Sequence, residues 1–131
     1  MRVEQWPLLR LRRHARRTVH LSAVVGSELI RAARNESSMS QLRGLWDGFQ
    51  RLRRIVVPTG EDWHDAGIVL AQVARKYGYE SLGQARLVHD TLIALSARRL
   101  GIAVVTLNAS GFQRISEFRR LSVLTPADLA L

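Results

Sequence analysis

The chain has 131 residues, of which 47% are apolar and 6% aromatic, and it contains no cysteine. This is enough for one globular domain with an aliphatic core, and it rules out disulfides, thiolate zinc sites and thiol nucleophiles. The 20 basic residues, 19 of them Arg, outnumber 11 acidic residues and give a net charge of +9, which suits a polyanionic partner but can equally reflect codon bias.

No apolar run approaches the roughly 18 residues of a membrane span, and the N-terminus lacks the apolar core of a signal peptide. We therefore expect a single domain over residues 1–131 that acts in the cytoplasm and has no membrane partner.

The first 20 residues carry much of the positive charge. They contain six Arg and one Glu, a local net charge of +5. Apolar residues recur at helical spacing after Pro7, which suits the first turn of a helix. A basic helix of this kind can contact nucleic acid or an acidic partner, although exposure to water alone is the commoner case.

Alternating helices and strands are expected over residues 18–57. Residues 18–21 predict a minimal strand, and Ser22 predicts the N-cap of a helix that runs to about Arg34. After a polar loop, the capping-box spacing of Ser38 and Gln41 predicts the start of a second helix. The β-branched run 55–57, ended by Pro58, predicts a short buried strand.

The alternation continues to the C-terminus. Thr59 predicts the N-cap of a helix that ends at Gly78, and a further helix over residues 84–100 ends at Gly101. Residues 102–106 are apolar on both faces, as a central parallel strand is. A weak helix at 112–118 and a strand at 121–124 follow. The pattern predicts an α/β fold in which helices flank a short, mostly parallel sheet.

Two carboxylates, Glu28 and Asp90, are expected on apolar helix faces. Their helical neighbours are Val24, Val25 and Ala32 for Glu28, and Leu87, Ile93, Ala94 and Ala97 for Asp90. An unpaired carboxylate in such a place costs several kcal/mol, so each requires a cation or strong hydrogen bonds. A buried Arg partner is the commoner explanation for either acid alone, whereas two inward acids on separate helices can converge on one metal ion.

Asn108 stands at the carboxyl end of the strongest predicted strand, where ligands bind in open α/β sheets. It can orient a water molecule or a metal-bound hydroxide, although residues 108–111 also have the composition of an ordinary turn. Asp62 and Asp65 follow a helix start and are interpreted as capping charges. A carboxylate-rich site without cysteine suits a hard cation such as Mg²⁺ or Mn²⁺.

Three segments resemble motifs of the PIN-domain family, most closely its VapC-type toxin ribonucleases. Residues 21–29 resemble the family's S-x-V-V-x-x-E-L segment, residues 89–94 its D-x-L-I-A helix, and residues 104–112 its V-V-T-x-N-x-x-D-F strand and turn. The three segments follow one another in the family's order. The resemblance covers most of the chain from Thr18 to Pro126.

The resemblance implies a PIN-like three-layer sandwich and a divalent-metal-dependent endoribonuclease, the toxin of a type II toxin–antitoxin system. It makes Glu28 and Asp90 ligands of Mg²⁺ or Mn²⁺ and places Asn108 in the outer position. RNA is the implied substrate, with Arg residues on its phosphate backbone. The implied protein partners are a second copy of the chain, in a homodimer, and a cognate antitoxin.

The sequence departs from the family at two acids. The family's first strand, which ends in D-T-N or D-T-S, has no counterpart here, and Gly111 stands where the family has an Asp before Phe. We therefore expect a PIN-like domain that is N-terminally incomplete, or a degenerate member. The alternative function is a non-catalytic PIN-like protein that binds an antitoxin or nucleic acid, and a basic nucleic-acid-binding module of another class ranks third.

Overall fold

The computed structural model describes residues 18–129, and its internal contacts divide the chain into two compact units. The first unit is Met1–Val57 and the second is Pro58–Leu131. The basic helix predicted after Pro7 lies outside the described residues. The chain has a mixed α/β fold, as predicted. The expectation of one domain over residues 1–131 stays a prediction.

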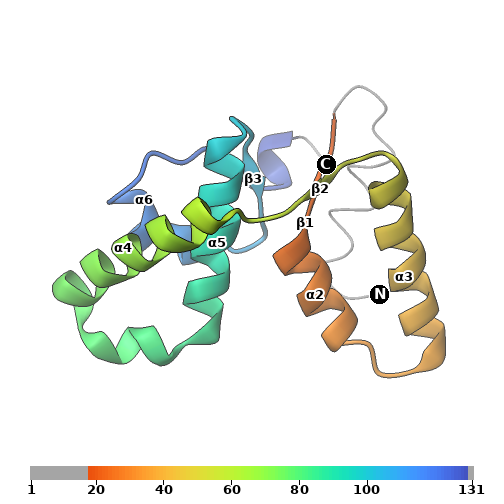
Figure 1. Ribbon diagram of the computed structural model, residues 1–131, viewed down its shortest axis with the longest axis horizontal. Coiled ribbons are helices and arrows are strands. Elements are labelled where there is room, and N and C mark those ends of the chain that lie inside the picture. The colour runs from red at the N-terminus through yellow and green to blue at the C-terminus, as the bar shows by residue number, and fades with distance from the viewer. Residues whose placement is uncertain (1–17, 130–131) are drawn as a thin grey trace. The chain divides into compact units, whose positions relative to one another are not determined.

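The first unit places two helices beside a minimal parallel sheet. Its elements are β1 (Leu21–Ser22), α2 (Ala23–Arg31), α3 (Glu36–Arg51) and β2 (Ile55–Val56). Strand β1 pairs in parallel with β2, so that Leu21 lies opposite Ile55. Helices α2 and α3 run side by side (Figure 1). Their core is formed by Leu21, Leu29, Leu42, Leu45 and Phe49.

The helix starts of the first unit follow from local hydrogen bonds. The Ser22 side chain accepts a hydrogen bond from the Val24 amide at 3.2 Å, which confirms the predicted N-cap of α2. The predicted start of α3 near Ser38 is wrong, because Asn35 is the N-cap. Its side chain accepts a hydrogen bond from the Ser38 amide at 2.8 Å, and Glu36 in the first turn suits the helix dipole.

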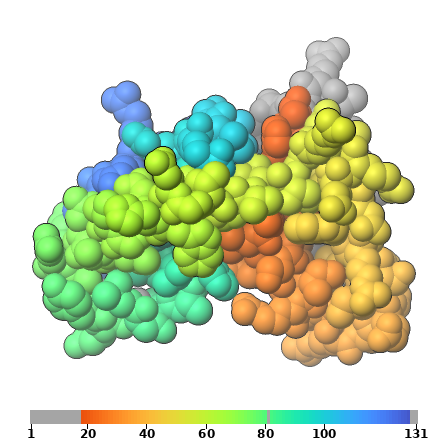
Figure 2. All heavy atoms as spheres, in the orientation of Figure 1, coloured from red at the N-terminus to blue at the C-terminus, as the bar shows by residue number. Residues whose placement is uncertain are grey.

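The second unit packs a helix pair against a second parallel sheet. Its longer helices are α4 (Gly60–Tyr77) and α5 (Ala85–Arg99), joined by the 3₁₀ turn η1 (Tyr79–Gly83). The remaining elements are β3 (Val104–Val105), η2 (Ala109–Phe112), α6 (Gln113–Ser116), β4 (Val123–Leu124) and η3 (Ala127–Leu129). Helix α4 and η1 lie on the face turned toward the viewer in Figure 2 (green).

The predicted sheet is realised only in part. Strand pairing is parallel, but residues 18–129 contain two separate two-stranded sheets, β1–β2 and β3–β4. The prediction that residues 102–106 form a central strand is wrong for the described residues, because β3 pairs only with β4. Apolarity on both faces reports burial, and here helix α5 packs on β3. It does not report how many strands lie alongside.

Asp62 joins the two long helices of the second unit. It is 5% exposed and completes a capping box with Thr59, as the predicted capping role requires. Its carboxylate also accepts hydrogen bonds from Arg99 Nε at 3.0 and 3.2 Å. The first turn of α4 is therefore held to the last turn of α5.

Helix α6 is held against the C-terminal end of α4. The Tyr77 hydroxyl donates a hydrogen bond to the Glu117 carboxylate at 2.5 Å, and Lys76 forms an ion pair with the same group at 3.2 Å. The Arg114 guanidinium stacks over the Tyr77 ring at 4.1 Å. These contacts fix the helix that directly follows η2.

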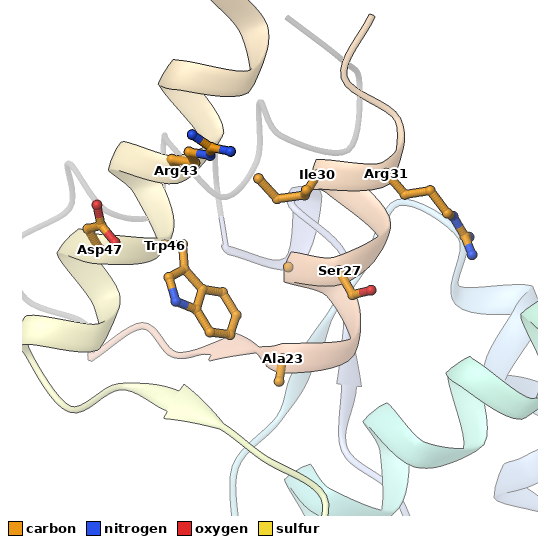
Figure 3. Close-up of a pocket in the computed structure, with 8 residues that line it drawn as sticks. Ala23, Ser27, Ile30, Arg31, Arg43, Trp46 and Asp47 are labelled. Carbon is orange, nitrogen blue, oxygen red and sulfur yellow. The ribbon is translucent and has the colours of Figure 1, made fainter. Parts of the chain in front are cut away.

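A glycine permits close packing in the first unit. A Cβ atom at Gly26 would lie 2.7 and 2.8 Å from two carbon atoms of the Trp46 ring, closer than van der Waals contact allows. Figure 3 shows the Trp46 indole extending from α3 toward α2, where Ala23 and Ser27 lie. The flat ring therefore packs on a part of α2 that has no side chain.

We expect Gly26→Ala to lower the free energy of unfolding by about 1 to 3 kcal/mol, because the added methyl group overpacks this contact. The matched control is Gly44→Ala on α3, where an added Cβ meets nothing within 4 Å. This control should gain up to about 1 kcal/mol from helix propensity. Urea unfolding measures both, and equal effects of the two variants would contradict the packing argument.

Candidate functional site

Asp90 lies directly before the buried segment of α5. It is partly buried itself, and the residues after it in α5 are buried: Thr91, Leu92, Ala94, Leu95, Ser96 and Ala97. The Thr91 and Ser96 hydroxyl groups donate to backbone carbonyls one turn earlier, each at 2.7 Å, and so satisfy their own hydrogen bonds within the helix. Asp90 is therefore held on a rigid, well-packed element.

Asn108 lies in the turn that follows β3. Its backbone amide donates to Thr106 Oγ1 at 3.0 Å, and its Oδ1 accepts a hydrogen bond from the Ser110 hydroxyl at 2.6 Å. The Gly111 amide donates to the Asn108 carbonyl at 3.2 Å and closes η2. The turn expected from the composition of residues 108–111 is confirmed, and it holds the Asn108 backbone through Thr106 and the Asn108 side chain through Ser110.

The side chains of Asp90 and Asn108 converge on Gly111. A Cβ atom at this glycine would lie 3.1 Å from Asp90 Oδ2 and 3.2 Å from Asn108 Nδ2. Because Gly111 has no side chain, a carboxylate from α5 and an amide from the turn after β3 both lie close to the space that a Cβ atom would fill. The structure thus brings together two of the three predicted site residues within the second unit.

Glu28, the third predicted residue, belongs to the first unit. It is partly buried on α2, whose buried residues are Gly26 and Leu29. The apolar face expected around Glu28 is therefore only partly buried. The Asp90 side chain is also only partly buried. The assignment of Glu28 as a metal ligand stays a prediction.

A divalent cation such as Mg²⁺ requires several oxygen ligands. Within residues 18–129, no group of three or more His, Asp or Glu side chains is arranged to hold a metal ion. Mg²⁺, however, is commonly bound by one or two carboxylates together with substrate phosphates and water. The Asp90 carboxylate is a ligand of the type that this binding mode requires. The Asn108 side-chain oxygen, in contrast, already accepts a hydrogen bond from Ser110.

The first unit contains an open pocket of about 450 Å³ that the sequence did not indicate. It lies between α2 and α3, and Figure 3 shows the residues that line it. Apolar contact is offered by Ala23, Ile30 and Trp46, and the charged residues are Arg31, Arg43 and Asp47. The lining holds a single carboxylate, so this pocket does not match the predicted metal site.

Asp65, interpreted above as a capping charge, is an ion-pair partner instead. Arg119 donates to its two carboxylate oxygens at 2.6 and 3.3 Å, and also to the Phe118 carbonyl at 2.8 Å. These hydrogen bonds lower the pKa of Asp65 from its ordinary value. The capping interpretation of Asp65 is wrong because Arg119 lies 54 residues away in the sequence, and rules for helix N-termini consider only nearby residues.

A comparison with models of known protein families finds no match, and none of the curated proteins is significantly similar to the chain. In the part of the chain that the structure describes, no helix is long and apolar enough to cross a membrane.

The lowered pKa of Asp65 makes a prediction about stability and pH. A carboxylate whose pKa is lower in the folded state stabilises the fold above its unfolded pKa, near 3.8, and loses this effect as the pH falls through the folded value. We expect Asp65→Asn to lower the free energy of unfolding by about 0.5 to 1 kcal/mol at pH 6. In urea unfolding, the difference from the unmodified protein should shrink as the pH drops below 3.8, and a difference independent of pH would contradict the ion-pair assignment.

Proposed function

We propose that this protein is a PIN-like, divalent-metal-dependent endoribonuclease, the toxin of a type II toxin–antitoxin system acting in the cytoplasm. The observation that carries the proposal is the meeting of Asp90 and Asn108 at Gly111. Asp90 and Asn108, which are 18 positions apart in the sequence, supply a carboxylate and an amide to one point, just beyond the carboxyl end of parallel strand β3. This is where open α/β folds bind their ligands.

The fold supports the proposal at a coarser level. Short parallel strands alternate with helices, and the order of the three family-like segments agrees with the order of β1–α2, α5 and β3–η2. The net charge of +9 and the 19 Arg residues suit a polyanion such as RNA. The three-layer PIN-like sandwich is part of the proposal.

In the proposed reaction, Asp90 would be a ligand of Mg²⁺ or Mn²⁺; a role of Glu28 as a further ligand is what the family resemblance implies. When bound, such a cation supplies an activated water and neutralises charge on the phosphate. The amide nitrogen of Asn108 points toward Gly111, close to the Asp90 carboxylate. There it can donate a hydrogen bond to a phosphate oxygen. Arg side chains bind the RNA backbone, which makes affinity depend on salt.

We expect the purified chain to cleave RNA in the presence of Mg²⁺ or Mn²⁺, and Asp90→Asn to lower the rate on the order of 100-fold, the scale of losing one charge-stabilising group. Asp47→Asn, the same change at an exposed position of α3, is the matched control and should retain the rate. Cleavage that survives a chelator, or an Asp90→Asn variant as active as the unmodified chain, would overturn the proposal.

The second candidate function is a non-catalytic PIN-like protein that binds RNA or an antitoxin. A specific observation favours it: the position that the family fills with an Asp is Gly111, directly beside Asp90. With one carboxylate at this point, the protein would bind a partner without turnover. Tight RNA binding without cleavage would support this candidate.

Gly111→Asp separates the two candidates. The added Cβ lies 3.1 Å from Asp90 Oδ2 and 3.2 Å from Asn108 Nδ2, so the two side chains must shift by a few tenths of an ångström to admit a second carboxylate. For an endoribonuclease, we expect this variant to lower the Mg²⁺ concentration for half-maximal cleavage about 10-fold, a change of roughly 1.4 kcal/mol in binding. Gly111→Asn, of equal size without the charge, is the control. For a binding protein, neither variant cleaves RNA.

A further inference from the structure

The Asn108 amide has a defined orientation. Its Oδ1 carries no hydrogen, so the 2.6 Å contact with Ser110 Oγ has the serine hydroxyl as donor. The Asn108 nitrogen points the other way, toward Gly111, whose ideal Cβ position lies 3.2 Å from Nδ2. A single hydroxyl thus determines which end of the amide faces the site.

This orientation decides what Asn108 offers to a ligand. The amide group presents N–H donors toward the point where Asp90 Oδ2 also arrives, and its oxygen is turned away to Ser110. N–H donors bind the oxygen atoms of an anion and do not coordinate a cation. Asn108 is therefore arranged as a hydrogen-bond donor to an anionic group beside Asp90, and not as an oxygen ligand of a metal ion.

We propose that Ser110 is a positioning residue, which holds the Asn108 amide so that its nitrogen donates to a phosphate oxygen of the substrate. The inference rests on the proposed function, because the phosphate is that of the RNA. The Ser110 hydroxyl donates to Asn108 Oδ1, and Ser110 acts through that residue. The turn favours this role, since Thr106 already fixes the Asn108 backbone and leaves only the amide to rotate.

Alternative roles of Ser110 are less well supported. Its side chain is exposed, so it adds little to the core. It lies two residues from Asn108 in a 3₁₀ turn whose backbone is closed by the Gly111 amide, so the turn does not depend on the hydroxyl. Removing that hydroxyl should leave the fold intact and release the amide alone.

The test compares Ser110→Ala with Ser110→Thr, which keeps a hydroxyl group. Ser116→Ala is the matched control, because Ser116 is also exposed and donates a 2.6 Å hydrogen bond, to the Gln113 carbonyl in α6. We expect Ser110→Ala to lower kcat for RNA cleavage about 10-fold, with KM, the Mg²⁺ requirement and thermal stability unchanged. Ser110→Thr should restore kcat, and Ser116→Ala should leave it unaltered.

A second readout does not require cleavage. In ¹⁵N-labelled protein, the side-chain amide signals of Asn108 should shift in Ser110→Ala, because the amide group then samples more than one orientation, and should keep their positions in Ser110→Thr. Unchanged Asn108 signals in Ser110→Ala overturn the inference whether or not the chain is a nuclease. An active chain whose kcat is unaffected by Ser110→Ala also overturns it and leaves the proposed function standing. An inactive chain removes the proposed function and the substrate role of Ser110 together.

Discussion

The ion pair between Asp62 and Arg99 sets the geometry on which the second unit depends. A nearly buried carboxylate is unfavourable unless its oxygen atoms are satisfied. Asp62 meets this condition with the Thr59 amide at 2.9 Å and Arg99 Nε at 3.0 and 3.2 Å. The start of α4 is thereby tied to the end of α5, the helix that carries Asp90.

The chain reversal after α5 brings the second half of the site into place. Gly101 adopts φ 68°, a left-handed conformation that disfavours other residues, and the Ile102 amide bonds back to the Ala97 carbonyl at 3.0 Å. Strand β3 then packs against α5 (Figure 1), and the turn that follows it carries Asn108. The approach of Asn108 to Asp90 is thus a consequence of helix packing followed by a tight turn, and the glycine at position 111 leaves room for both side chains.

Most helix ends could be predicted from the sequence, whereas interactions between residues distant in the sequence could not. The caps at Ser22 and Thr59 and the stop at Gly101 depend on atoms within a few residues, so residue types alone indicate them. The start of α3 was misplaced because Asn35 and Ser38 both have capping side chains, and only the folded backbone selects between them. Arg119 as the partner of Asp65 depends on tertiary structure. At the site, spacing suggested Asp90 and Asn108, but nothing in the sequence marked Ser110 as the residue that turns the amide.

The shortness of the strands determines how local stability is distributed. Each ladder spans two residues per strand and rests on few backbone bonds, such as Val104 to Ser122 at 2.8 Å and Thr106 to Leu124 at 2.9 Å. The amides of α4 and α5, in contrast, lie in long hydrogen-bonded helices with a shared core. Ladder amides can therefore exchange with solvent through small local openings while the helix pair stays folded. The turn that carries Asn108 follows directly from such a ladder, so it can adjust to a ligand without disturbing the helix that holds Asp90.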